Sequence, residues 1–327
     1  MKNILLILQE TTVCIISIVI FFSSCKHHPS ISFDLTITPD TLELFAPGII
    51  STELYERDMA ISPDGNEIMY SLGTYDQSRR CLVAIVKSDQ GWGNKEVVNI
   101  SGVYQDIEPF YAAEGNTLFF VSDRPMPSDT TRNDYNIWKS QRVNGAWNDP
   151  VPLSDLINTT EGEYYPSLSR NGNLYFTATR RDGMGREDIL VSRYVNGNYQ
   201  QPEVLDTNIN SATYEFNAYI SPDEDVLIFS SYGREDDLGG GDLYYSVRNT
   251  DGSWTKAKNL GATINSDKLD YCPFVDYARG NFYFTSDRSA ESRGGIEDTG
   301  ELSRLANHPL NGMGNIYRID MNKLRIK

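Results

Sequence analysis

The sequence predicts an all-β protein in which one unit of four antiparallel strands is repeated five times. The chain of 327 residues contains 20 Tyr and 13 Phe, and a composition rich in aromatic and small polar residues favours short strands joined by tight turns. Five similar turn motifs follow one another along the chain, each in front of an apolar or aromatic segment. Because the motifs recur about every 50 residues, we expect one supersecondary unit to be repeated.

The turns begin each unit, and their residue types have a conformational reason. Pro and Asp start a turn and Gly accepts a positive φ; the five turns span 62–66, 113–116, 170–173, 221–225 and 278–281. An apolar strand follows each turn, at 67–71, 118–122, 174–177, 226–230 and 282–286. Third strands are predicted at 82–86, 136–139, 188–192, 242–246 and 315–318.

A second hairpin with an aromatic residue follows four of the third strands, at 91–92, 144–147, 196–199 and 251–254. We expect its ring to pack between neighbouring sheets. Four strands in a unit of this length are typical of a propeller blade. The sequence therefore predicts a five-bladed β-propeller with four-stranded antiparallel blades.

The fifth unit ends after its third strand, near Met321. Residues 42–51 are similar to the outer strands of the other units, and 45–51 align with 260–266. Pairing this N-terminal segment with the last unit closes the ring and removes exposed edges. Six blades remain possible if the leader or the insert at 289–313 holds another unit.

The N-terminus has the pattern of a secretory signal. Met1-Lys2-Asn3 is followed by apolar residues 4–8, a polar patch at 9–12 and an apolar run at 13–22, before Ser23-Ser24-Cys25. A membrane span needs about 20 apolar residues, and Glu10 interrupts this one. We expect a signal peptide at 1–24, a linker at 25–39 and the propeller at 40–327.

Phe22-Ser23-Ser24-Cys25 resembles the lipobox of bacterial lipoproteins, which implies acylation of Cys25, with palmitate among the acyl groups. Acyl chains attach a protein to a membrane without a span. The residues after Cys25 lack the acidic run that resembles a surface-export signal of some lipoproteins, which favours an outer-membrane anchor facing the periplasm. Cys81 and Cys272 then remain; a disulfide between them is allowed there, but we expect two buried thiols on different strands.

The Ser-Pro-Asp-Gly turn at 62–65 and the Ser-Asp-Arg segments at 122–124 and 286–288 resemble the TolB-like, WD-repeat-like propeller family. The resemblance covers residues 40–322 and implies a periplasmic or surface propeller that binds proteins or other ligands. It implies no single activity. We expect a monomer that binds an envelope protein or a glycan. The net charge of −16 argues against a nucleic-acid partner, since phosphate binding needs Lys and Arg.

Aligning the units places one carboxylate just before each first strand: Glu56, Asp106, Glu163, Glu215 and Asp270. We call these five residues the acidic column. One interpretation is cation binding at the channel mouth, with calcium as the candidate, because hard cations prefer oxygen ligands. The other is that each carboxylate accepts backbone or hydroxyl hydrogen bonds from a neighbouring blade. We favour the second, because a feature of every unit usually serves the repeat.

Catalysis is the alternative to binding. A carbohydrate-active hydrolase or lyase needs two carboxylates in different surroundings, and Glu163 and Glu215 have the most aromatic neighbourhoods of the column. The near equivalence of the column argues against this role. The chain has three histidines, His27, His28 and His308, and they offer neither a convincing Ser-His-Asp site nor a zinc site.

The unrepeated segments carry further hypotheses. The acidic, glycine-rich loop 233–242 offers Asp236, Asp237 and Asp242 as ligands for a cation, or it contacts a partner, or it is a flexible hairpin. The insert at 289–313 is a contact segment or a short helix. Arginines follow four of the second strands, and we expect them to form ion pairs with local Asp residues rather than bind an acidic ligand: Arg124, Arg180, Arg234 and Arg288.

Overall fold

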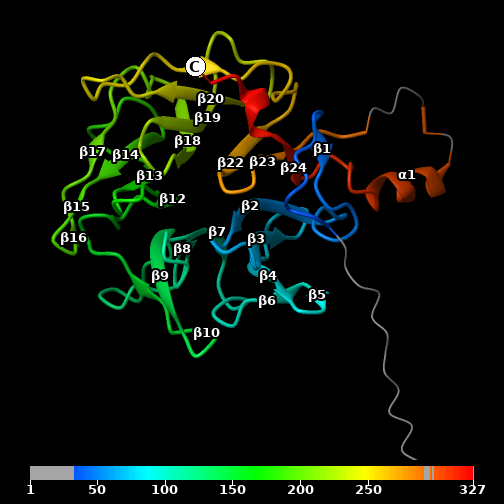
Figure 1. Ribbon diagram of the computed structural model, residues 1–327, viewed down its shortest axis with the longest axis horizontal. Helices are drawn as coiled ribbons and strands as arrows, with labels where there is room; N and C mark the ends of the chain where they lie inside the picture. The colour runs from blue at the N-terminus through cyan, green and yellow to red at the C-terminus, as the bar shows by residue number, and fades with distance from the viewer. Residues whose placement is uncertain (1–32, 291–294, 297, 327) are drawn as a thin grey trace, which may run out of the picture. The chain divides into compact units, whose positions relative to one another are not determined.

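A computed structural model describes residues 33–290, 295–296 and 298–326, which all belong to the compact unit formed by residues 31–327. Within these residues, five antiparallel sheets surround a common centre as the blades of a β-propeller (Figure 1). The described part of the insert forms helix α1 (Thr299–Ala306) rather than a sixth sheet. The predicted signal peptide and Cys25 lie outside the described residues.

The strands predicted behind each turn are present, and several are longer than predicted. The inner strands are β2 (Tyr55–Ile61), β7 (Asp106–Tyr111), β12 (Glu163–Leu168), β18 (Tyr214–Ile220) and β22 (Asp270–Asp276). The second strands are β3 (Glu67–Gly73), β8 (Thr117–Ser122), β13 (Leu174–Ala178), β19 (Val226–Tyr232) and β23 (Asn281–Ser286). The third strands are β4 (Arg80–Ser88), β9 (Asn136–Val143), β14 (Asp188–Ser192), β20 (Asp242–Val247) and β24 (Asn315–Asp320).

The outer strands have two residues each. They are β6 (Glu96–Val97), β11 (Val151–Pro152), β17 (Glu203–Val204), β21 (Lys258–Asn259) and, from the N-terminal segment, β1 (Glu43–Leu44). Four further short strands, β5 (Gly91–Trp92), β10 (Ala146–Trp147), β15 (Tyr194–Val195) and β16 (Asn198–Tyr199), belong to the second hairpins. The 3₁₀ helix η1 (Met321–Leu324) follows β24.

Side chains of neighbouring sheets form the core. Trp147, from the second hairpin of its blade, packs with Met69 and Leu82 of the preceding blade. Trp254 packs in the same way with Tyr175 and Ile189. The aromatic residues of these hairpins therefore pack between sheets, as expected, and each blade depends on its neighbour for burial of its apolar faces.

The N-terminal segment closes the ring. Strand β1 pairs antiparallel with β24, where Glu43 lies opposite Arg318 and Leu44 opposite Tyr317. The last sheet has the order β1-β24-β23-β22, so its outer strand comes from the start of the domain. The predicted closure is confirmed, and the two ends of the domain are held by one sheet.

The prediction of a strand over 42–51 was too long. After Leu44 the chain turns, and the N–H groups of Ile49 and Ile50 donate to the carbonyl oxygen of Ala46 at 3.0 and 2.9 Å. Ile264 and Asn265 donate to Gly261 in the same way at the end of the preceding blade. The similarity between 45–51 and 260–266 is therefore real, but most of it describes the connection after the strand.

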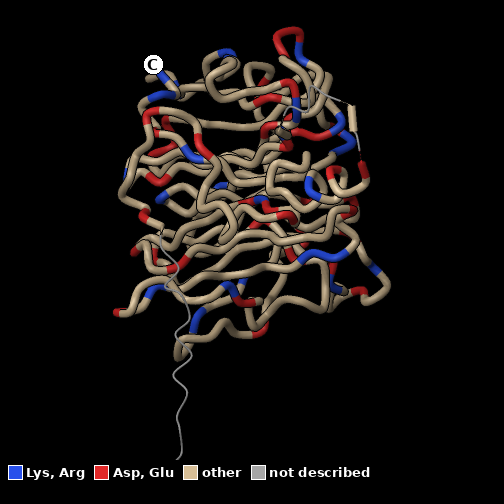
Figure 2. Tube along the Cα trace, turned by 90° about the vertical axis from the view of Figure 1, so that its right-hand side faces the viewer, with Lys and Arg blue, Asp and Glu red and all other residues tan. Residues whose placement is uncertain are grey.

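The ring has two different ends. At one, which we call the loop end, the inner strands begin and the second strands finish, and the connections there span 74–79, 123–135, 179–187, 233–241 and 287–314. At the other, the turn end, the inner and second strands are joined by the short repeated turns. Acidic positions, red in Figure 2, occur from one end to the other, so the net charge does not mark one end.

Cys81 is half-buried on β4 and Cys272 is buried on β22, and both are free thiols. They lie on strands of different blades, as expected, but only Cys272 has the burial that was expected of both. No helix among residues 33–290, 295–296 and 298–326 has the length and apolarity to cross a bilayer.

Candidate functional site

All five carboxylates of the acidic column are fully buried at the start of the inner strands. Each accepts a hydrogen bond from a serine or threonine hydroxyl that precedes its strand, and these donors are Thr52, Ser101, Thr159, Ser211 and Ser266. At zero exposure the column is out of reach of a dissolved cation or sugar. Its carboxylates accept hydrogen bonds from groups of the repeat itself.

Four members of the column are also paired with arginine. The distances are 2.5 Å for Arg124–Asp106, 2.7 Å for Arg180–Glu163, 2.9 Å for Arg234–Glu215 and 2.6 Å for Arg288–Asp270. Each arginine also donates to the carbonyl oxygen of an isoleucine that precedes the same inner strand. All four arginines pair with acids of their own blade; two of these acids are Asp residues, as expected, and the other two are Glu residues. Glu163 and Glu215, the candidates for catalysis, are therefore both buried and neutralised.

Glu56 is the member of the column without an arginine. In the other blades the arginine follows the second-strand residue that pairs with the column acid; Arg124, for example, comes two residues after Ser122, the partner of Asp106. The partner of Glu56 is Leu72, and the residue two positions later is Thr74. The backbone N–H of Thr52 donates to Glu56 at 2.9 Å. Burial raises the pKa of Glu56 to about 7, although the Thr52 hydrogen bonds and the charge of Lys95 act against this rise.

Glu56→Gln should therefore change how stability depends on pH. The folded-state pKa of Glu56 lies above its ordinary value of 4.5, so its stabilising contribution is present below pH 4.5 and is lost as the pH rises through about 7. Relative to the wild type, the variant should gain up to about 3 kcal/mol of unfolding free energy between these pH values. Urea unfolding at a series of pH values measures this.

Glu161→Gln is the matched control, because Glu161 is exposed, precedes the inner strand of another blade and does not act on the pKa of Glu56. Its unfolding free energy should follow the wild type at every pH. If Glu56→Gln also runs parallel to the wild type, Glu56 does not titrate in the folded protein near neutral pH.

A second column lies two residues after the first, at the centre of the channel. Every inner strand has a β-bulge there, and the bulged residues have positive φ: Asp58, Glu108, Tyr165, Asn217 and Cys272. Such backbone conformations cost about 1–3 kcal/mol each for residues other than glycine and cluster at functional sites. Bulges also redirect side chains beside such sites. We call these residues the bulge column.

The bulge column differs in every blade, and its side chains meet. Cys272 donates its thiol hydrogen to Asp58 at 2.7 Å, and the backbone N–H of Tyr165 donates to Glu108 at 2.6 Å. Asn217 donates to Glu108 at 3.4 Å. This column was not predicted from the sequence. It could have been found as the one position of the repeated inner strand whose residue type differs in every unit.

Arg57 joins the two acids of the bulge column. Its guanidinium lies 2.8 Å from Asp58 and 2.9 Å from Glu108, and it covers the ring of Tyr271 at 5.1 Å. Burial and the charge of Asp58 raise the pKa of Glu108, while Arg57 opposes the rise. The centre of the channel is thus filled by one cation shared between two carboxylates.

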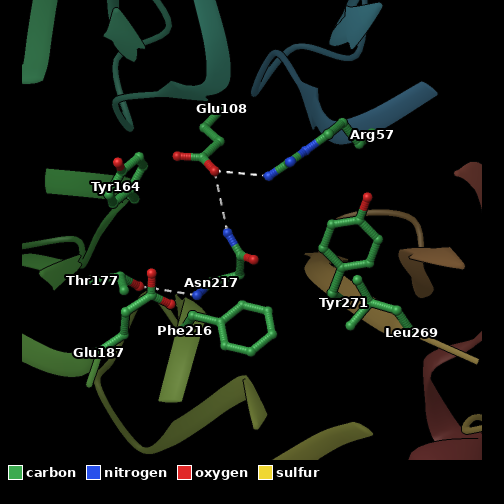
Figure 3. Close-up of a pocket in the computed structure, with 9 residues that line it drawn as sticks. All are labelled: Arg57, Glu108, Tyr164, Thr177, Glu187, Phe216, Asn217, Leu269 and Tyr271. Carbon is green, nitrogen blue, oxygen red and sulfur yellow. Dashed lines mark hydrogen bonds and ion pairs between the residues drawn. The ribbon is translucent and has the colours of Figure 1, made fainter. Parts of the chain in front are cut away.

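A cavity of about 240 Å³ opens on the loop-end side of this cluster. Nine residues line it: Arg57, Glu108, Tyr164, Thr177, Glu187, Phe216, Asn217, Leu269 and Tyr271. Figure 3 shows Arg57 and Asn217 directed at Glu108 from opposite strands, with rings on both sides of the space. The lining therefore combines aromatic faces with charged and amide groups, as small-molecule sites do.

A second cavity of about 290 Å³ lies at the turn end. The rings of Phe110, Tyr219 and Phe274 line it together with residues of the repeated turns, and its Arg279 is paired with Asp276 at 2.9 Å. Features repeated in every unit usually serve the repeat. The loop-end cavity, lined by residues that differ from blade to blade, is the better candidate site.

The acidic loop is held by its own hydrogen bonds. Asp236 accepts from the Tyr244 hydroxyl, Asp237 from the N–H groups of Gly233 and Gly239, and Asp242 from Leu238 N–H. A β-carbon at Gly239 would lie 2.4 Å from the Asp267 carbonyl oxygen, so this glycine permits close packing. Across the described part of the chain, no group of three His, Cys, Asp or Glu side chains is arranged to hold a metal ion.

No protein-family model and no curated protein matches the chain. Solved structures of similar fold include a candidate TolB protein from Agrobacterium tumefaciens, with 15% identity, TM-score 0.46 and coverage of 75% of this chain and 73% of that one. A GH43 endo-arabinanase from Bacillus licheniformis has 12% identity, TM-score 0.48 and coverage of 86% and 96%. The β-propeller domain of the Trilobed protease from Pyrococcus furiosus has 11% identity, TM-score 0.38 and coverage of 73% and 66%.

Proposed function

We propose that this propeller is a non-catalytic binding protein of the bacterial cell envelope. It is tethered through lipid on Cys25 and takes a ligand, or a segment of an envelope protein, into the loop-end cavity. The observation that carries the proposal is the lining of that cavity, where Arg57, Glu108 and Glu187 stand among the rings of Tyr164, Phe216 and Tyr271.

The position of the cavity supports a binding role. The long, unrepeated connections gather at the loop end, and Glu187 closes one of them, the connection at 179–187. In repeat proteins such insertions commonly collect on the binding face, and binding residues on loops are positioned by the rigid scaffold below. The ring of blades supplies that scaffold here.

The carboxylates support binding rather than catalysis. Glycoside hydrolysis uses two carboxyl groups with separate roles, and Glu163 and Glu215 are buried and paired with arginines. Of the two carboxylates lining the cavity, Glu108 is engaged by Arg57 and by Tyr165 N–H. One carboxylate, that of Glu187, is left for a ligand, and one is too few for that chemistry.

The envelope location rests on the N-terminal segment. A basic start, an apolar run and Ser23-Ser24-Cys25 have the order of a lipoprotein signal, although these residues lie outside the described part of the chain. With Cys25 as the first residue after cleavage, few residues precede the closing strand β1. The tether would therefore keep the propeller near the membrane surface.

Photo-crosslinking in intact bacterial cells tests the proposal. A photoreactive amino acid at Met184, an exposed residue of the loop-end connection 179–187, should capture a specific ligand or partner. The same amino acid at Val143, exposed at the opposite end of β9, should not. Cys25→Ser should release the protein from the membrane fraction and remove the adduct.

Equal amounts of adduct from positions 184 and 143 would contradict specific binding at the loop end. A membrane-bound Cys25→Ser variant would contradict the lipid tether. If the purified chain instead cleaves a glycan, and Glu187→Gln abolishes the cleavage, the protein is a carbohydrate-active hydrolase and the binding proposal is lost.

A further inference from the structure

Glu187 has an unusual position among the acids of the propeller. It lies at the end of the connection 179–187, and its backbone carbonyl accepts the N–H of Glu215 at 3.1 Å, which attaches it to the start of β18. Within the described residues its carboxylate has no hydrogen-bond or ion-pair partner, although the residue is half-buried and burial raises the pKa of its carboxyl group. A partly buried carboxylate without a partner is costly.

The cationic side chain that lines the cavity already has two carboxylate partners. Arg57 is the one cation among the nine lining residues, and it is held by Asp58 and Glu108 at 2.8 and 2.9 Å. In Figure 3 the carboxyl group of Glu187 faces the space beside Asn217, on the other side of the cavity from Arg57. The negative charge at this side of the cavity is therefore not compensated by the protein.

Aromatic rings surround the same space. Tyr164, Phe216 and Tyr271 line the cavity, and Tyr271 already has the guanidinium of Arg57 against its ring at 5.1 Å. Ring faces attract cations, most strongly where water is excluded. The volume of about 240 Å³ is below that of sites for drug-sized molecules, about 300–1,000 Å³, and suits a small charged group on a short alkyl chain.

We propose that the loop-end cavity binds an organic cation, the ammonium or guanidinium group that lysine, arginine and small amines carry, between the carboxylate of Glu187 and the rings of Tyr164 and Phe216. This inference rests on the proposed binding function and names its ligand class. The cation supplies the positive charge that pairs with the Glu187 carboxylate, and its alkyl chain covers the rings. A neutral sugar would leave Glu187 uncompensated.

Calorimetric titration of the full chain tests the ligand class. The probes are the blocked peptide Gly-Gly-Lys-Gly-Gly, the same peptide with norleucine in place of lysine, butylammonium and a neutral trisaccharide. The lysine peptide should bind at least about tenfold more tightly than the norleucine peptide, and its affinity should fall as salt is added. If butylammonium binds and the lysine peptide does not, the source of the cation is a free amine.

Glu187→Gln keeps the shape of the side chain and should weaken binding of the lysine peptide about tenfold. Because the Glu187 carboxylate has no partner in the described residues, the variant should fold at least as stably as the wild type. Asp182→Asn is the matched control: Asp182 is an exposed acid of the same connection and is not among the lining residues. It should leave the affinity unchanged.

If the lysine and norleucine peptides both bind, and bind equally, or if Glu187→Gln has no effect on binding, the proposal of an organic cation is wrong. It is also wrong if neither the lysine peptide nor butylammonium binds at about 10 mM. If the trisaccharide binds and is recovered intact, the ligand class is wrong but the binding function stands. If it is cleaved, the binding function itself is wrong.

Discussion

Arg124→Met is expected to destabilise the propeller by about 3–5 kcal/mol, the cost of leaving a buried charge without its partner. Arg124 lies 2.5 Å from the fully buried Asp106, and it also donates to the Ser122 hydroxyl and to the Ile100 carbonyl oxygen. Methionine fills much of the same volume but removes all three interactions. Urea-induced unfolding followed by tryptophan fluorescence measures the loss.

Arg170→Met is the control for this substitution. Arg170 pairs with Asp223 at 2.7 Å, but the two side chains are 64% and 65% exposed. Exposed ion pairs contribute about 0–1 kcal/mol, so this variant should unfold close to the wild type. Similar losses in the two variants would mean that burial of the Arg124–Asp106 pair adds nothing, and the structural role given to the acidic column would fail.

Phe45→Ala is expected to cost about 3–5 kcal/mol, the usual range for removing a buried phenylalanine. Phe45 is 1% exposed and follows the closing strand β1. Its ring centroid lies 5.6 Å from that of Phe33 and 5.1 Å from that of Tyr283, and Arg318 covers it at 4.9 Å. The substitution therefore opens a cavity where the two ends of the domain are joined.

Ile37→Ala tests whether the loss is specific to closure. Ile37 belongs to the same N-terminal segment but is 53% exposed, and exposed substitutions change stability by about 0.5 kcal/mol at most. Calorimetry should show one lowered transition for Phe45→Ala and an unchanged one for Ile37→Ala. An unchanged Phe45→Ala protein would show that the ring holds together without this contact.

Much of the fold could be predicted because its signals are local. The turn at 62–66 shows why: its Ser62 hydroxyl accepts from Glu67 N–H, and Asp64 accepts from Asn66 N–H, all within six residues. The closing strand was found by its similarity to another unit. Its length was overestimated, because the sequence similarity continues through the connection after Leu44.

The candidate site was predicted only in part. The acidic column and the four arginines were both recognised, but which acids the arginines contact follows from hairpin register, since Arg124 and Asp106 are 18 residues apart. The sequence singled out Glu163 and Glu215, which are fully buried. It did not single out Glu108 and Glu187, which line the cavity. Nothing local distinguishes a carboxylate that faces a cavity from one that faces a hydroxyl.

The sequence by itself therefore determined the blade: turn chemistry, alternation of apolar strands and repetition specify a unit that must pack against copies of itself. The tertiary structure alone decided the site. Asp58 and Cys272 are 214 residues apart and meet in one hydrogen bond, because closing the ring brings the five inner strands to one axis. A site at that axis is assembled from residues of all five blades, so no single segment of the chain contains it.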